Sequence, residues 1–172
     1  NPNRKVLVCD LEEAMLYKSD LVSIHINFGV QHEAEMLKDL AQIAKACQIH
    51  QTPLLAMLYA KNKNHENNKE PEVIKHIVRV GAELGADIIK CSYTGSSETV
   101  KHVVDTCPVP ILVAGGSKTD EMKILKDIYD AMQAGAKGVC VGRNFFQHQN
   151  PQSFLRAINE IVHRQGEVNE AF

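Results

Sequence analysis

A lysine at the end of an apolar run is the residue of this sequence whose chemistry most needs an explanation. Lys90 follows Ile88 and Ile89 in the stretch ADIIKCSYTG, and Ser92 comes two positions later on the same face of an extended chain. Burial disfavours the charged form of an amine, and a neutral amine forms Schiff bases with carbonyls. The alternative is a lysine that buries its stem and keeps its ammonium group in water. Tyr59, at the end of another apolar run, favours the Schiff-base interpretation.

Two glycine-containing turns have the composition of an anion site. The segment AGGSK contains Gly115, Gly116 and Ser117, and the segment VGRN contains Gly142 and Arg143. Backbone N–H groups of such turns can approach an oxyanion closely, and an arginine adds positive charge. One glycine pair after a strand is more often a plain turn, but here the last two β-rich runs both end in this way. We therefore predict a phosphate site made by the two turns.

The elements that must position these residues are strands and helices in alternation. The β-rich runs are mostly continuous and apolar, which is typical of parallel strands covered on both faces. Amphipathic segments with helical spacing lie between them. We predict strands at Lys5–Cys9, Leu21–Asn27, Pro53–Tyr59, Asp87–Ser92, Val109–Ala114 and Gly138–Gly142.

Local signals place the helix ends. Helix starts are indicated by Pro71, Ser96-Ser97, Thr119-Asp120 and Asn150-Pro151, and helix ends by Gly85 and Gly135. Strand–helix repetition without a break predicts one α/β domain over residues 1–172.

Chemistry in parallel α/β folds gathers at the carboxyl ends of the strands. His25, Tyr59, Lys90 and Ser92 all stand near such ends, together with the two glycine turns. An open doubly wound sheet and a TIM barrel both fit the pattern. The first predicted strand lacks the glycine-rich turn of a dinucleotide site, which weakens the doubly wound alternative. The polar segment Lys61–Glu70 is either a solvated loop or a substrate lid.

Composition narrows the class of protein. The 172 residues are 44% hydrophobic and carry a formal net charge of −2, so we expect a globular domain without the basic surface of a nucleic-acid-binding protein. No apolar run approaches the roughly 18 residues of a membrane span. The five scattered cysteines form no C-x-x-C pair, which favours reduced thiols in a cytoplasmic protein over a zinc site or disulfides. We expect no metal and no cofactor.

Several motifs in order resemble the class I aldolases of the DeoC/FbaB family, which includes archaeal-type fructose-bisphosphate aldolase and 2-amino-3,7-dideoxy-D-threo-hept-6-ulosonate synthase, a related transaldolase. The motifs are VSIHINFG, PLLAMLY, ADIIKCSYTG, CPVPILVAGGSK and AGAKGVCVGRNFFQH, and they cover nearly the whole chain. The resemblance implies a TIM barrel, a phosphorylated sugar substrate and a homo-oligomer. It also implies that Lys90 forms the Schiff base, that Tyr59 shuttles protons, and that Gly115, Gly116, Gly142 and Arg143 bind phosphate. His25 and Asn27 match a motif that lines the site.

The sequence departs from the family pattern in two places. Ala60-Lys61-Asn62 follows the tyrosine where Pro-Arg-Gly is usual, and an opening segment with Asp-His-Gly has no counterpart. Only about the last five βα units of a barrel are expected, with Lys5–Cys9 as an accessory piece. Two origins of the short barrel stay open: a part of a longer aldolase, or a short protein that completes its sheet with another chain. Three activities also stay open: an aldolase, a transaldolase, and an inactive sugar-phosphate-binding or assembly module.

Overall fold

The computed structural model describes residues 3–64, 66–164 and 166. Five strands pair side by side in parallel in the order β1-β2-β4-β5-β6, and a short sixth strand, β3, pairs antiparallel with β2. The strands are β1 (Val22–Phe28), β2 (Leu54–Lys61), β3 (Asn67–Asn68), β4 (Ile88–Ser92), β5 (Ile111–Ala114) and β6 (Gly138–Cys140).

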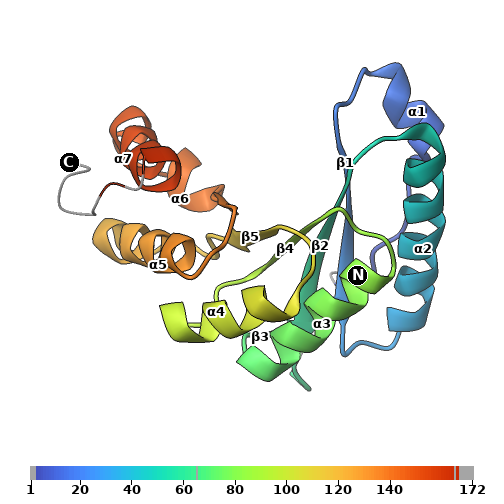
Figure 1. Ribbon diagram of the computed structural model, residues 1–172, viewed down its shortest axis with the longest axis horizontal. Coiled ribbons are helices and arrows are strands. Elements are labelled where there is room, and N and C mark those ends of the chain that lie inside the picture. Colours follow the sequence, from blue (N-terminus) through green and yellow to red (C-terminus); the bar gives the residue numbers. More distant parts are fainter. Residues whose placement is uncertain (1–2, 65, 165, 167–172) are drawn as a thin grey trace.

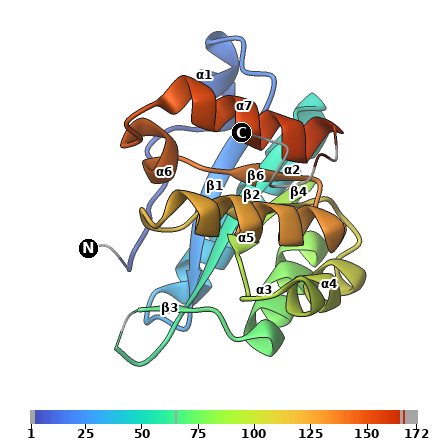
Figure 2. The ribbon, with the colours of Figure 1, turned by 90° about the vertical axis from the view of Figure 1, so that its left-hand side faces the viewer.

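Helices connect the parallel strands and lie on the outer side of the curved sheet (Figure 1). Figure 2 shows that α5 and α7 lie next to each other in front of the sheet. The sheet and its helices form part of the wall of a barrel, as predicted. The helices are α1 (Leu11–Leu16), α2 (Glu33–His50), α3 (Pro71–Glu83), α4 (Ser97–Thr106), α5 (Glu121–Gln133), α6 (Arg143–Phe146) and α7 (Pro151–Arg164).

Capping residues explain where these helices begin and end. Ser96 caps α4 in a reciprocal capping box with Thr99, and the Asp120 side chain accepts a hydrogen bond from the Lys123 backbone N–H at the start of α5. Gly85 and Gly135 follow α3 and α5 with φ values of +96° and +97°, a region that glycine enters without strain. The predicted helix boundaries are confirmed at these positions.

Two apolar clusters hold the layers together. The larger cluster lies between the outer face of the sheet and helices α2, α3 and α4, and includes Leu58, Ile77 and Ile89. The smaller cluster joins α5 to α7 through Leu125 and Phe154. No helix among the described residues is both long enough and apolar enough to cross a membrane.

The predicted strand at Lys5–Cys9 is wrong. This segment has no strand geometry, and Val6 and Val8 are 60% and 90% exposed. It lines a pocket together with residues 23–26 of β1, so it lies beside the edge strand without pairing to it. β-branched residues favour an extended chain, but a strand also needs a partner backbone, which composition does not reveal. Sequence patterns also missed α1, α6 and β3, which are short and lack a full period of hydrophobic spacing.

Candidate active site

The inner face of the sheet carries the candidate site. Along β2, Leu54, Ala56, Leu58 and Ala60 are buried, whereas the alternate residues, Tyr59 among them, are partly exposed. A Cβ atom added to Gly81 of α3 would lie 2.5 Å from a methyl carbon of Leu58 and 3.3 Å from one of Ile89, so these two side chains face the helices. Because side chains alternate along a strand, Tyr59 and Lys90 face the other way.

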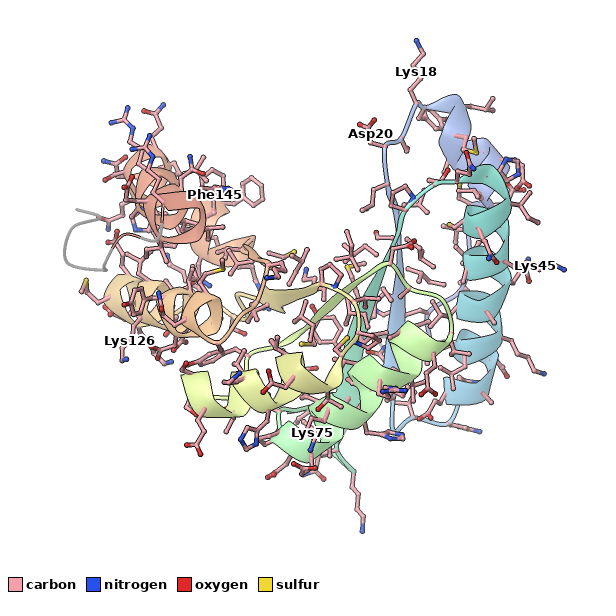
Figure 3. The ribbon with its side chains drawn as sticks, in the orientation of Figure 1. Lys18, Asp20, Lys45, Lys75, Lys126 and Phe145 are labelled. Atoms are coloured by element: carbon pink, nitrogen blue, oxygen red, sulfur yellow. The ribbon has the colours of Figure 1, made fainter. Side chains whose placement is uncertain are left out.

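Surface lysines of the helical layer provide a contrast. Lys45 on α2 and Lys126 on α5 are exposed and point outward from the helices (Figure 3). Lys90 is instead half-buried on a strand in the middle of the sheet, where Met57 of β2 and Leu112 of β5 are its register partners. Its position on an inner strand face agrees with the sequence prediction.

The ammonium group of Lys90 acts on two neighbouring side chains. Burial raises the pKa of the Cys140 thiol on β6, and the positive charge of Lys90 opposes this rise. Burial also lowers the pKa of His25 on β1, with further lowering by Lys5, Lys61 and Lys90 that a hydrogen bond to Asn27 partly offsets. His25 is therefore neutral near pH 7. Lys90 thus lies close enough to strands on both of its sides to influence their ionisation.

A contact between rings links His25 to Tyr59. Their ring centroids are 5.0 Å apart with an interplanar angle of 43°, and His25 Nε2 lies 3.2 Å from Asn27 Oδ1. An amide oxygen only accepts hydrogen bonds, so in this arrangement Nε2 carries the proton. Burial raises the pKa of Tyr59, the nearby thiols of Cys140 and Cys91 add to the rise, and Arg143 opposes it. Tyr59 therefore keeps its phenolic proton and is available as a donor.

The two glycine turns are joined by a buried asparagine. Asn144 is 3% exposed, and its Nδ2 donates to the Gly115 carbonyl at 3.0 Å and to the Ser117 carbonyl at 3.1 Å. Its Oδ1 accepts from the Thr119 backbone N–H at 2.8 Å. The sequence places Asn144 among the polar residues that follow the strand ends, but it gave no reason to assign this asparagine a role in the site.

The turns have the open geometry that an anion site needs. Gly116 has a φ of +68°, and a Cβ atom added to Gly116 or to Gly142 would meet nothing within 4 Å. Ser117 and Arg143 are exposed beside them. Lys118 donates from Nζ to the Gln147 carbonyl at 2.8 Å and so links the first turn to the end of α6.

The fold brings most of the predicted site residues to one end and one face of the sheet. His25, Tyr59 and Lys90 share the inner face, and Ser92 is a buried residue at the end of β4. Across the described residues, no group of three or more His, Cys, Asp or Glu side chains is placed to hold a metal ion. A cavity of about 730 Å³ between the ends of α2 and α3 contains none of these residues, and we assign it no role in the chemistry.

Comparison with known proteins places this geometry in a family. The sequence model of the DeoC/LacD family aldolases matches residues 1–148. The chain is 36% identical over 167 residues to 2-amino-4,5-dihydroxy-6-oxo-7-(phosphonooxy)heptanoate synthase of Streptomyces griseus, covering 96% of this chain and 61% of that protein. It is 40% identical over 163 residues to 2-amino-3,7-dideoxy-D-threo-hept-6-ulosonate synthase 1 of Archaeoglobus fulgidus, covering 95% of this chain and 60% of that protein.

A solved structure of a Schiff-base-forming fructose-1,6-bisphosphate aldolase superposes with a TM-score of 0.88 at 34% identity, covering 92% of this chain and 64% of that one. The chain thus spans about three fifths of the length of the curated relatives named here. The match to the family model covers well over half of the chain. The two relatives at 36% and 40% identity support the same family. The chain belongs to the DeoC/LacD family of aldolases.

Proposed function

We propose that this chain contributes the catalytic lysine of a class I aldolase that acts on a phosphorylated ketose. The observation that supports it best is the position of Lys90, half-buried on the inner face of the sheet between His25 and Cys140. An amine in such a place can attack a ketone carbonyl, and loss of water then yields a protonated imine.

The imine acts as the electron sink for the carbon–carbon bond. As that bond breaks, its electron pair moves to the imine nitrogen, an enamine forms, and the released half leaves as an aldehyde. The hydroxyl proton lost in this step passes to water. We assign the protonation of the enamine carbon to Tyr59, because its raised pKa keeps the phenol protonated until that step, and the phenolate then regains a proton from water. A water molecule finally hydrolyses the imine and frees Lys90.

The phosphate of the ketose is assigned to the turns that contain Gly115, Gly116, Gly142 and Arg143. Asn144 holds these turns together through three hydrogen bonds, so the backbone N–H groups of Gly116, Gly142 and Arg143 are positioned before the substrate arrives. The Gly115 N–H donates instead to the Cys140 carbonyl at 3.0 Å. Ser117, Ser92 and His25 are proposed to line the same substrate site. The predicted homo-oligomer remains a prediction.

A second candidate reaction has support from the relatives. Two of them, at 36% and 40% identity, are named as synthases of seven-carbon amino acids rather than as sugar aldolases. The same imine chemistry run toward bond formation would serve such a synthase, with a different aldehyde as acceptor.

Reductive trapping tests the proposal. Borohydride added to the intact protein with fructose 1,6-bisphosphate should attach the sugar covalently to Lys90, as peptide mass mapping would show. Lys90→Met should abolish the adduct, and Lys126→Met on the outer surface should not (Figure 3). An adduct that survives in Lys90→Met would disprove the assignment. Product analysis with several aldehyde acceptors then separates the aldolase from the synthase.

A further inference from the structure

Bond cleavage needs a group that accepts a proton, because the hydroxyl group on the carbon that leaves as the aldehyde must lose one. Among the described residues, the ionisable side chains at inner-face positions of the five parallel strands are His25, Tyr59, Lys61, Lys90 and Cys140. Lys90 is bound in the imine, and Lys61 is a cation. Burial raises the pKa of Tyr59 and of Cys140, so both keep their protons. Burial lowers the pKa of His25, which leaves it an unprotonated ring nitrogen near pH 7.

Asn27 fixes which of the two ring nitrogens is unprotonated. Asn27 is 1% exposed, and its Nδ2 donates to the backbone carbonyl of Asn3 at 3.4 Å. A carbonyl oxygen only accepts hydrogen bonds, so this contact orients the amide group with Oδ1 toward His25 Nε2, 3.2 Å away. Nε2 therefore carries the ring proton, and Nδ1 presents a lone pair.

The position of His25 suits a proton transfer next to the imine. Its ring centroid lies 5.0 Å from that of Tyr59, the residue assigned to the enamine carbon. The hydroxyl group that loses its proton is on the carbon bonded to that enamine carbon before cleavage, so the two proton-transfer groups must be neighbours. Met57 is the register partner of both His25 and Lys90. Two strand spacings, roughly 10 Å, thus separate these two residues, a span that their side chains and a bound ketose can bridge.

Transfer of the proton to His25 adds no charge to the site. As the carbon–carbon bond breaks, its electron pair neutralises the positive imine nitrogen of Lys90, while the ring gains one positive charge with the proton. The total charge around the two residues therefore stays constant during the step. Besides burial, the positive charges of Lys5 and Lys61 lower the pKa of His25, so the ring then releases its proton readily.

We propose that His25 is a catalytic residue whose Nδ1 takes the hydroxyl proton during carbon–carbon cleavage, and that Asn27 is the positioning residue that fixes its tautomer. The inference rests on the proposed function, since it requires the imine at Lys90. In this step the O–H bond breaks, the Nδ1–H bond forms, and the electron pair of the oxygen completes the aldehyde carbonyl. The ring then passes its proton to water. His25 also lines a cavity of about 420 Å³ between β1 and residues 4–9, which has room for that water.

Trapping within a single turnover tests the role of His25. Fructose 1,6-bisphosphate is mixed with an excess of the intact protein, borohydride is added at successive times, and the mass of the adduct on Lys90 is measured. A hexose bisphosphate adduct marks the imine before cleavage, and a triose phosphate adduct marks the imine after cleavage and protonation of the enamine. His25→Ala should form the hexose adduct but convert it to the triose adduct at least about 10²-fold more slowly than the wild type. His102→Ala, at an exposed position of α4, should match the wild type.

Added bases separate proton transfer from packing. Imidazole should restore conversion in His25→Ala, whereas pyrazole, a ring of the same size that is a far weaker base, should not. His25→Gln keeps a donor for Asn27 but has no basic nitrogen, so it should show the same loss even if His25→Ala does not fold. Asn27→Ala should slow conversion without rescue by imidazole, and nitrogen-15 NMR should then show a mixture of His25 tautomers.

The possible outcomes separate this inference from the proposed function. Equal conversion in His25→Ala and the wild type, a wild-type protein that holds only the hexose adduct, or equal rescue by imidazole and pyrazole would each overturn the catalytic role of His25. The aldolase proposal would survive all three results, because the adduct on Lys90 still forms. Absence of any adduct on Lys90 in the wild type would instead refute the aldolase proposal, and the role of His25 with it.

Discussion

Removal of the Asn144 side chain is the perturbation that tests the architecture of the phosphate turns most directly. Asn144→Ala deletes three hydrogen bonds at once, to the Gly115 and Ser117 carbonyls and from the Thr119 backbone N–H. A net value of about 1 kcal/mol for each bond gives about 3 kcal/mol in total. Ser117 and Thr119 are exposed, so water replaces part of what is lost. We expect the free energy of unfolding to fall by about 2 kcal/mol.

Asn144→Asp separates hydrogen bonding from shape. One carboxylate oxygen can still accept from the Thr119 N–H, but the other would face the carbonyl oxygens of Gly115 and Ser117. Both this repulsion and burial favour the protonated form, so the pKa of the new carboxyl should be higher in the folded state than in the unfolded state. The stability of Asn144→Asp should therefore be best at acid pH, below the unfolded-state pKa, and should decline as the pH rises through the folded-state pKa.

Urea unfolding followed by circular dichroism measures both effects, and it suits a chain without tryptophan. Calorimetry with inorganic phosphate measures the second consequence, weaker anion binding once the turns are no longer joined. The wild-type protein over the same pH range is the control. A loss below about 0.5 kcal/mol in Asn144→Ala, the ordinary scatter of surface substitutions, would refute the structural role given to this residue. An Asn144→Asp protein whose stability followed the wild-type pH dependence would refute the described contacts.

Four further substitutions test other parts of the site. Tyr59→Phe should lower kcat by about 10² or more while the borohydride adduct still forms, because only the proton relay is removed; a variant with full activity would exclude that role. The pKa of His25 is lower in the folded state than in the unfolded state, so the folded protein favours the neutral imidazole. The stability that His25 contributes is therefore complete above the unfolded-state pKa of about 6.5, and it is lost as the pH falls through the folded-state pKa. His25→Gln should flatten the urea stability profile between about pH 7 and pH 5, and an unchanged slope would contradict this. Gly116→Ala adds only backbone strain at a φ of +68°, so it should lower the free energy of unfolding by about 1 kcal/mol. Gly29→Ala has a similar φ of +75° but also brings a methyl group to 2.6 Å from the Lys61 carbonyl oxygen. It should therefore cost at least about 1 kcal/mol more than Gly116→Ala. Equal losses in the two glycine variants would show that the contact at Lys61 is absent.

The alternation of elements could be read from the sequence because each signal acts locally or repeats with a short period. Ser96 and Asp120 cap the helices that follow them, and Gly85 and Gly135 end the helices before them, since these effects need only a few neighbouring residues. Buried parallel strands are recognisable as continuous apolar runs because helices and inner-face residues cover both sides. The same reasoning placed Lys90 on the inner face, two residues before Ser92.

Other features depended on contacts between residues that are distant in the chain. The segment Lys5–Cys9 has the composition of a strand, yet only the structure shows that it lacks a partner backbone. Asn144 resembles any turn asparagine until the fold brings Gly115 and Ser117 to its amide group. Lys61 belonged to a polar run in the sequence, and only the fold places its charge close enough to lower the pKa of His25.

The sequence by itself determined the order of the five parallel strands and of helices α2, α3, α4, α5 and α7, several helix ends, and the set of polar residues at strand ends. The register of the sheet and the pairing of its turns decided which of those residues meet. The physical reason is that propensity and periodicity act over a few neighbouring residues. The electrostatic field at Lys90 and the geometry of an anion site depend instead on side chains from several strands, and only the backbone pairing of the sheet brings those side chains together.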